Sequence, residues 1–319
     1  MRSVDGENDR SNTGEAEVAE HGDIGARQNS DRFLTLHRAI RVAHRRAQRA
    51  QTASIVMSLL VACLSIATPF ASWTTPYVVL IGAAWAAVYA VVVVPWAGRY
   101  LRTSATLQEM YDVGLFGLPW NTVAVGDPVP EDEVSRLDRR FRENPRRLHD
   151  YYLVAQVRPP YDVLFCLEQN LAWGTRVRRR FADLMVAVVV LWCVAGVAGA
   201  VAMQITVADL VAQWFIASLG LLLLCLDIYR LQVSATTERT RVLGLLRSIG
   251  GRNDLAAGPE LTAFFRQVQD VLFQLRRSQP RVPTWFFNLF HDDDLADFQF
   301  KMRALEERVG RTPQPAGSS

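Results

Sequence analysis

Residues 77–96 read YVVLIGAAWAAVYAVVVVPW, an apolar stretch that contains no charged side chain. An α-helix rises about 1.5 Å per residue, so ~20 apolar residues cross the hydrocarbon core of a bilayer. Three further apolar runs, at about 53–70, 184–205 and 210–228, have similar lengths. A charge in the middle of such a span costs roughly 2.5–3.5 kcal/mol, and the middle of each run lacks one. The four runs predict an all-α membrane protein with four transmembrane helices in two hairpins.

The distribution of arginine predicts how these hairpins are oriented. The short link 71–75 is uncharged, whereas Arg49 and Arg99 flank the first hairpin, and Arg180 and Arg230 flank the second. Loops rich in Arg and Lys stay in the cytoplasm, so we expect both termini and the central block there. About fifty polar residues precede the first span, so we interpret that span as a retained anchor and not as a cleavable signal peptide.

The chain is therefore expected to alternate between polar and apolar segments. In order these are a disordered tail at 1–30, a basic juxtamembrane helix at 31–52, transmembrane hairpin 1 at 53–97, a helical cytoplasmic domain at 98–182, transmembrane hairpin 2 at 183–229, C-terminal cytoplasmic helices at 230–310 and a second tail at 311–319. The first tail has few large apolar side chains, so burial cannot offset the entropy lost on ordering it.

Hydrophobic periodicity predicts the helices of the cytoplasmic segments. We expect the second span to continue until the glycines at 114 and 117. A short helix is expected at 131–143, and a single unbroken helix from the prolines at 159–160 through Arg180 into the third span. A strongly amphipathic helix is expected at 259–278, and a last helix at 284–309.

No residue pattern indicates catalysis, so we expect no enzyme and no cofactor. The chain lacks the G-x-S-x-G, H-E-x-x-H and Walker motifs, and its four cysteines lack C-x-x-C spacing. The acidic cluster His291–Asp294 could hold a divalent cation, but a solvated acidic patch is the favoured interpretation, and we predict no metal site. The spans contain no central ionisable residue, which disfavours an ion-coupled transporter.

Two features leave alternatives open. The central block combines arginines such as Arg139 and Arg140 with aromatic residues, which suits an anionic nucleotide, although cytoplasmic arginine also satisfies the orientation rule without any ligand. Small residues such as Gly82 and Ala86, and Gly196 and Ala200, recur four apart in the spans, which suits either an oligomer interface or packing within one bundle. A pore would need several chains, because four mostly apolar spans cannot enclose a polar lumen.

The run Leu107–Asn121, LQEMYDVGLFGLPWN, resembles the SMODS-associated four-transmembrane effector family of bacterial anti-phage systems. The resemblance continues through Cys166–Asn170 and through Trp173–Phe181, and it returns at Val282–Trp285. It covers about residues 30–303. One departure is that Leu167 and Glu168 stand where the family often has Gln and Arg.

The resemblance implies an effector in the bacterial inner membrane that permeabilises this membrane when a separate synthase makes a cyclic oligonucleotide. The implied partners are the lipid bilayer, further copies of the chain as a homo-oligomer, and the cyclic oligonucleotide, with no DNA or RNA duplex. The residues that we predict to bind the ligand are Trp120, Asn121, Gln169, Asn170 and Trp173. The alternative is a membrane scaffold or receptor that does not conduct and recruits a partner through the helix at 259–278.

Overall fold

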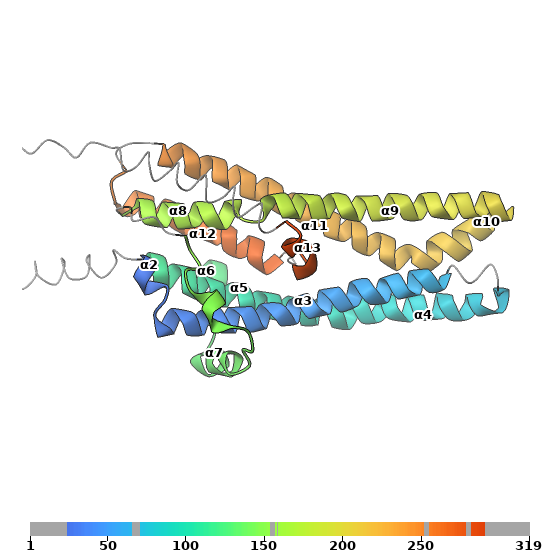
Figure 1. Ribbon diagram of the computed structural model, residues 1–319, viewed down its shortest axis with the longest axis horizontal. Coiled ribbons are helices and arrows are strands. Elements are labelled where there is room, and N and C mark those ends of the chain that lie inside the picture. Colours follow the sequence, from blue (N-terminus) through green and yellow to red (C-terminus); the bar gives the residue numbers. More distant parts are fainter. Residues whose placement is uncertain are drawn as a thin grey trace, which may run out of the picture.

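The computed structural model describes residues 24–65, 71–153, 157, 159–251, 255–278 and 282–290. All regular structure in these ranges is helical, and no strand occurs there, which confirms the all-α prediction. The molecule is elongated (Figure 1). Four long apolar helices extend toward one end, and at the other end the polar segments pack into what we call the head, residues 24–49, 99–181 and 230–278 among those described.

The first hairpin consists of two long rods that lie side by side. Helix α3 (Asp31–Ser65) carries the basic segment directly into the first span. The chain returns through η1 (Ser72–Thr74), α4 (Thr75–Val88), η2 (Tyr89–Val93) and α5 (Val94–Phe116). The segment η2 is π-helical: the Val94 N–H bonds to the carbonyl of Tyr89, five residues earlier, and not to the residue four positions earlier as in an α-helix. The next residue, Pro95, has no backbone N–H to donate, which favours this local change. Gly117, at φ +65°, ends α5 in the left-handed conformation.

The second hairpin corrects one prediction. Helix α8 (Tyr161–Ala172) and helix α9 (Thr175–Met203) are separate, whereas a single unbroken helix was expected. Trp173 is extended and Gly174 has φ +72°, a conformation that costs glycine little and that breaks the helix before the third span. The return path runs through α10 (Val207–Leu210), η4 (Val211–Ile216) and α11 (Ala217–Gly250), which ends at a pair of glycines, 250 and 251.

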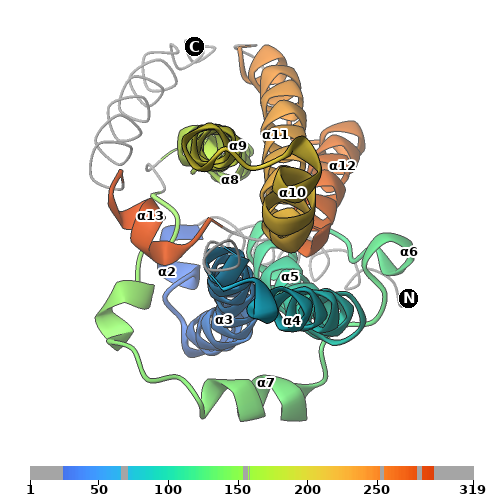
Figure 2. The same cartoon turned by 90° about the vertical axis from the view of Figure 1, so that its right-hand side faces the viewer.

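The apolar helices keep most of their side chains on the outside of the molecule. In the most apolar 18-residue stretch of each candidate span, the buried share is only 6% for the span within Thr75–Phe116 and 11% for the span within Tyr161–Met203, against 33% for each of the other two. Viewed along the long axis, α4 and α9 lie on different sides, and α11 packs against α3 between them (Figure 2). Apolar surface of this extent has a favourable environment only in lipid, so the chain is a multi-pass membrane protein.

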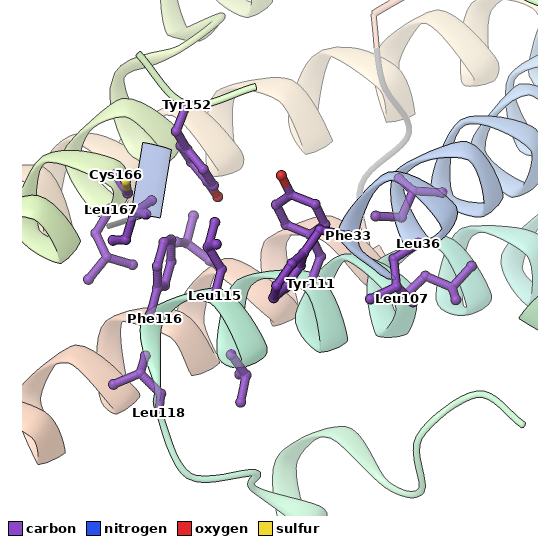
Figure 3. Packing of buried hydrophobic residues seen from close by; sticks show 14 of the residues in the cluster. Phe33, Leu36, Leu107, Tyr111, Leu115, Phe116, Leu118, Tyr152, Cys166 and Leu167 are labelled. Atoms are coloured by element: carbon purple, nitrogen blue, oxygen red, sulfur yellow. The ribbon is translucent and has the colours of Figure 1, made fainter. Parts of the chain in front are cut away.

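The head is built around one apolar cluster that draws on both hairpins (Figure 3). Phe33 of α3, Tyr111 and Phe116 of α5 and Leu167 of α8 all contribute to it. Helix α12 (Pro259–Ser278) has the predicted bounds and packs against α5 and α8. Its apolar residues are buried in the head, namely Phe265, Val268, Leu272, Phe273 and Leu275. The face on which the scaffold alternative relied is therefore occupied within the chain itself.

Short helices complete the described chain and modify two expected boundaries. Helix α2 (Ile24–Arg27) is packed, with Ile24 only 2% exposed, so ordered structure begins before residue 31. Helix α6 (Thr122–Val125) follows α5, and α7 (Glu131–Asp138) ends five residues before the predicted 143 because residues 139–143 form turns. A 3-10 turn, η3, spans Pro145–Leu148. Of the predicted helix 284–309 the structure describes α13 (Thr284–Asn288), while His291–Asp294 and the tails at 1–23 and 311–319 lie outside the described residues.

Candidate functional site

Charged residues enter the interior of the head where α5 faces α12. Glu109 and Asp112 are three residues apart on α5, so they lie on the same helix face, and the side chains of both are fully buried. The facing side chains on α12 are Arg266 and Arg276, each 9% exposed, with Gln269 between them. Charges this deep in a protein persist only when they are paired and hydrogen-bonded.

Asp112 is the centre of this arrangement. Its carboxylate accepts hydrogen bonds from Arg276 Nη1 at 2.6 Å, from Gln269 Nε2 at 3.0 Å and from the Tyr152 hydroxyl at 2.6 Å. Burial, and next the charge of Asp112, raise the pKa of Tyr152, so the phenol stays neutral and remains a donor. Burial alone would lower the pKa of Arg276, but the carboxylate of Asp112 raises it above its ordinary value, so the ion pair stays charged.

Glu109 forms the second half of the arrangement. It is ion-paired with Arg266, and its Oε2 accepts a hydrogen bond from Gln269 Nε2 at 3.0 Å. Gln269 therefore bridges the two buried carboxylates. Arg266 also donates to Asp270 at 2.9 Å and to the backbone carbonyl of Pro119 at 3.2 Å.

The hydrogen bonds continue from this centre to the remaining helices of the head. Tyr152 Oη accepts from Asn170 Nδ2 of α8 at 2.6 Å, and the Asn170 carbonyl accepts from Arg239 Nη1 of α11 at 2.6 Å. In the other direction, Asn121 Nδ2 donates to Asp270 at 2.9 Å. We call these connected residues the head network, and they are Glu109, Asp112, Asn121, Tyr152, Asn170, Arg239, Arg266, Gln269, Asp270 and Arg276. The network links α5, α8, α11 and α12, and α5 and α11 are continuous with membrane spans.

A groove of about 700 Å³ lies between α11 and α12, next to the head network. It is lined by six residues with polar side chains and by two apolar residues, namely Ser234, Thr237, Glu238, Asp270, Gln274 and Ser278, and Val271 and Leu275. Both of its carboxylates are paired with arginine, because Asp270 bonds to Arg266 and Glu238 bonds to Arg241. Asp270 belongs to both the groove and the head network. Among the described residues, no group of His, Cys, Asp or Glu side chains could hold a metal ion.

The structure places the five predicted ligand residues in separate surroundings. Trp120 donates from its indole to the Gly126 carbonyl at 3.0 Å, and Asn121 caps α6 by accepting from the Ala124 N–H at 3.2 Å. On the other side of the head, Gln169 bonds to the backbone of the loop before α8, with the Leu153 N–H at 3.1 Å and the Tyr151 carbonyl at 3.2 Å.

The other two predicted residues lie further along the same side of the head. Asn170 is part of the head network, and the ring of Trp173 lies 6.4 Å from that of Phe287. The structure thus brings Asn121 and Asn170 into one network, but it does not bring all five residues to one cavity.

The sequence interpretation missed the charged centre of the head network, although the sequence contains a signal for it. Glu109 and Asp112 interrupt the apolar face of α5, and Arg266 and Gln269 do the same on the otherwise apolar face of α12. Charges placed at core positions of two amphipathic helices indicate that they pair across a helix interface. Their actual pairing depends on tertiary contacts between residues about 160 positions apart.

Four apolar helices, joined to a head with a buried ionic network, define a multi-pass membrane protein. The chain belongs to the SMODS-associating 4TM effector domain family, whose profile matches residues 22–305. It is also similar to a protein of Bacillus cereus (strain VD146) described as a "probable CBASS effector molecule", with 24% identity over 280 residues, or 84% of this chain and 93% of the relative. No solved structure matches the chain. The resemblance inferred from residues 107–121 is thereby confirmed.

Proposed function

We propose that this anti-phage defence effector permeabilises the bacterial inner membrane as an oligomer when a cyclic oligonucleotide binds its head. The head would lie in the cytoplasm with both termini, as the flanking arginines favour. Family membership and the CBASS effector relative support the defence role. The opening of the membrane and the nucleotide trigger are what the family resemblance implies, and the direct joining of the head to the spans supports such a coupling.

The observation that carries the proposal is the head network. Asp112 lies on α5, which is continuous with the second span, and Arg239 lies on α11, which is continuous with the fourth. A displacement of α12 would separate Arg276 from Asp112 and Arg266 from Glu109 and would move both helices. A ligand drives such a change only if it binds the displaced state more tightly than the resting state.

The groove between α11 and α12 is the proposed ligand site. Its hydroxyls and its Gln274 amide suit the edges of nucleobases and sugars, and Val271 and Leu275 supply apolar surface for a base. An anionic ligand would meet carboxylates that arginines already neutralise. Asn121 is one hydrogen bond away through Asp270, so it would sense occupancy, whereas Gln169, Asn170 and Trp173 would transmit the change toward α8 and α9.

An assembly of several copies is the proposed conducting form, because one copy has too few spans to enclose water. The outward faces of α4 and α9 are available for contacts between copies. The space beside Gly196 is already occupied by a side chain of the same chain, since a Cβ there would lie 2.4 Å from Trp214 Nε1. Gly199 remains a candidate for close contact between copies, because no described heavy atom lies within 4 Å of a Cβ at that position.

The test is propidium entry into bacteria that express this chain with an active or a catalytically inactive cyclic-oligonucleotide synthase, with membrane potential followed in parallel for narrower pores. Entry or depolarisation only with the active synthase supports the proposal. The matched variant replaces Trp120 and Asn121 together by Ala, and it should abolish the response at an equal level in the membrane. A response that is equal with either synthase overturns the trigger, and no response in either reporter favours the non-conducting scaffold.

A further inference from the structure

We propose that α13 binds the headgroup layer of the bilayer, with Trp285 and Leu289 inserted among anionic lipids, so that it fixes the depth of the head at the membrane. This inference is independent of any nucleotide trigger. It starts from the place of α13, a five-residue helix near the middle of the long axis, where the head meets the apolar helices (Figure 1).

Contacts fix the level of α13 along the molecule. Gln48 Nε2 of α3 donates to the Val282 carbonyl at 3.3 Å, and the Thr284 hydroxyl donates to Gln48 Oε1 at 3.1 Å. On the other side, the Phe286 ring lies 5.2 Å from that of Phe181 of α9. The apolar runs begin at about residues 53 and 184, which at 1.5 Å per residue is roughly 5–8 Å further along each helix from Gln48 and Phe181. That interval matches the thickness of a headgroup layer, about 5–7 Å on each side of the hydrocarbon core.

The two faces of this segment differ in the way that an interfacial helix requires. Phe286 is 6% exposed and packs against the second hairpin, whereas Trp285 is 58% exposed and Leu289 is 66% exposed. Viewed along the long axis, α13 lies at one edge of the bundle, where it is beside both α3 of the first hairpin and α9 of the second (Figure 2). Indole rings concentrate at the boundary between lipid and water, and an exposed Leu beside one gains free energy there but not in water.

Arginines at the same level favour an anionic lipid surface, and the exposed Asp183 there is ion-paired with Arg179. The Arg180 guanidinium lies 4.4 Å from the centre of the Phe290 ring, directly after α13, and Arg46 lies over the Tyr100 ring at 5.2 Å. Arg49, one residue beyond Gln48, is exposed. The attraction of each arginine to an anionic leaflet adds to the apolar contribution of the inserted side chains.

The experiment measures the depth of position 289 in the full-length protein. Leu289→Cys is labelled with bimane and reconstituted into vesicles of phosphatidylethanolamine and phosphatidylglycerol that contain lipids brominated near the headgroup end of the acyl chain. The matched control is Val123→Cys on α6, which is 99% exposed in the head, and the unmodified chain gives the background from the four native cysteines.

We expect lipid bromine to quench the label at 289 at least ~2-fold more than the label at 123, and aqueous iodide to show the opposite order. Replacing phosphatidylglycerol by phosphatidylcholine should reduce the lipid quenching at 289. Equal lipid quenching at the two positions, or an unchanged signal without anionic lipid, overturns the proposal. Because no nucleotide is present, neither result bears on the proposed trigger.

Discussion

Replacing Asp112 by Asn should destabilise the head strongly, because it leaves a buried cation without its counter-ion. Asp112 is fully buried, Arg276 is 9% exposed, and their atoms approach to 2.6 Å. In Asp112→Asn the new amide group faces the donors of Arg276, Gln269 and Tyr152, and one of these donors must lose its acceptor. Breaking a buried pair from one side costs about 3–5 kcal/mol.

The assay is thermal unfolding of the purified protein in detergent, followed by the fraction that still elutes as a folded species in size-exclusion chromatography. At roughly 2–4 °C per kcal/mol, the expected drop in midpoint is roughly 6–20 °C. The control is Glu133→Gln, whose pair with Arg136 spans 3.7 Å and has side chains 37% and 53% exposed. An exposed pair contributes about 0–1 kcal/mol, so this midpoint should fall by less than ~4 °C.

A second variant separates the lost ion pair from general disruption. Asp112→Asn combined with Arg276→Met removes the stranded cation and should recover part of the lost midpoint. The reasoning is refuted if Asp112→Asn shifts the midpoint no more than Glu133→Gln does. It is also refuted if the double variant loses, relative to the unmodified protein, the full sum of the midpoint losses of Asp112→Asn and Arg276→Met alone.

Two further perturbations test other contacts. Gly196→Ala should destabilise the second hairpin by about 1–3 kcal/mol, because the added Cβ would lie 2.4 Å from Trp214 Nε1, while Gly199→Ala should be tolerated; equal thermal midpoints for the two variants would contradict this packing. Glu143→Gln should speed tryptic cleavage next to α7 by roughly 2–5-fold, because it removes the ion pair that holds this segment to Arg41 of α3. The effect is modest because both side chains of the pair are partly exposed. Burial alone would raise the pKa of Glu143, but hydrogen bonds and charges from Arg41 and Arg45 together lower it by more, so the net pKa lies below its usual value. This stabilisation is therefore present at neutral pH and is lost as the pH falls through that lowered pKa, which amide hydrogen exchange of α7 in acid would detect.

Much of the architecture could be predicted because lipid imposes simple requirements. In a bilayer every backbone group must be satisfied within the helix, so an uncharged run of sufficient length is a reliable sign of a span. The bounds of α12 were also readable, since Pro259 can occupy the first turn and the apolar periodicity continues to Leu275. The break between α8 and α9 was missed, because Gly174 is tolerated within a helix and only its φ of +72° reveals the turn.

The internal chemistry of the head was harder to predict. Asp112 and Arg276 are 164 residues apart, and either could equally have been solvated in a sequence-based interpretation. Trp120 and Asn121 were assigned to a ligand from the resemblance, and the structure shows that both also make local hydrogen bonds around α6. Their role in a response stays a prediction, with the paired alanine variant as its test.

The measurement that tests the central claim most directly is release of an encapsulated small dye and of K⁺ from liposomes that contain this protein alone. A nucleotide fraction from cells with an active cyclic-oligonucleotide synthase is added, and the same fraction from cells with the inactive synthase is the control. The account predicts release with the active fraction only, and no release when Trp120 and Asn121 are both Ala. No release of dye or K⁺ with either fraction, from protein shown to be inserted, would contradict the claim that the head opens a leak through its own spans.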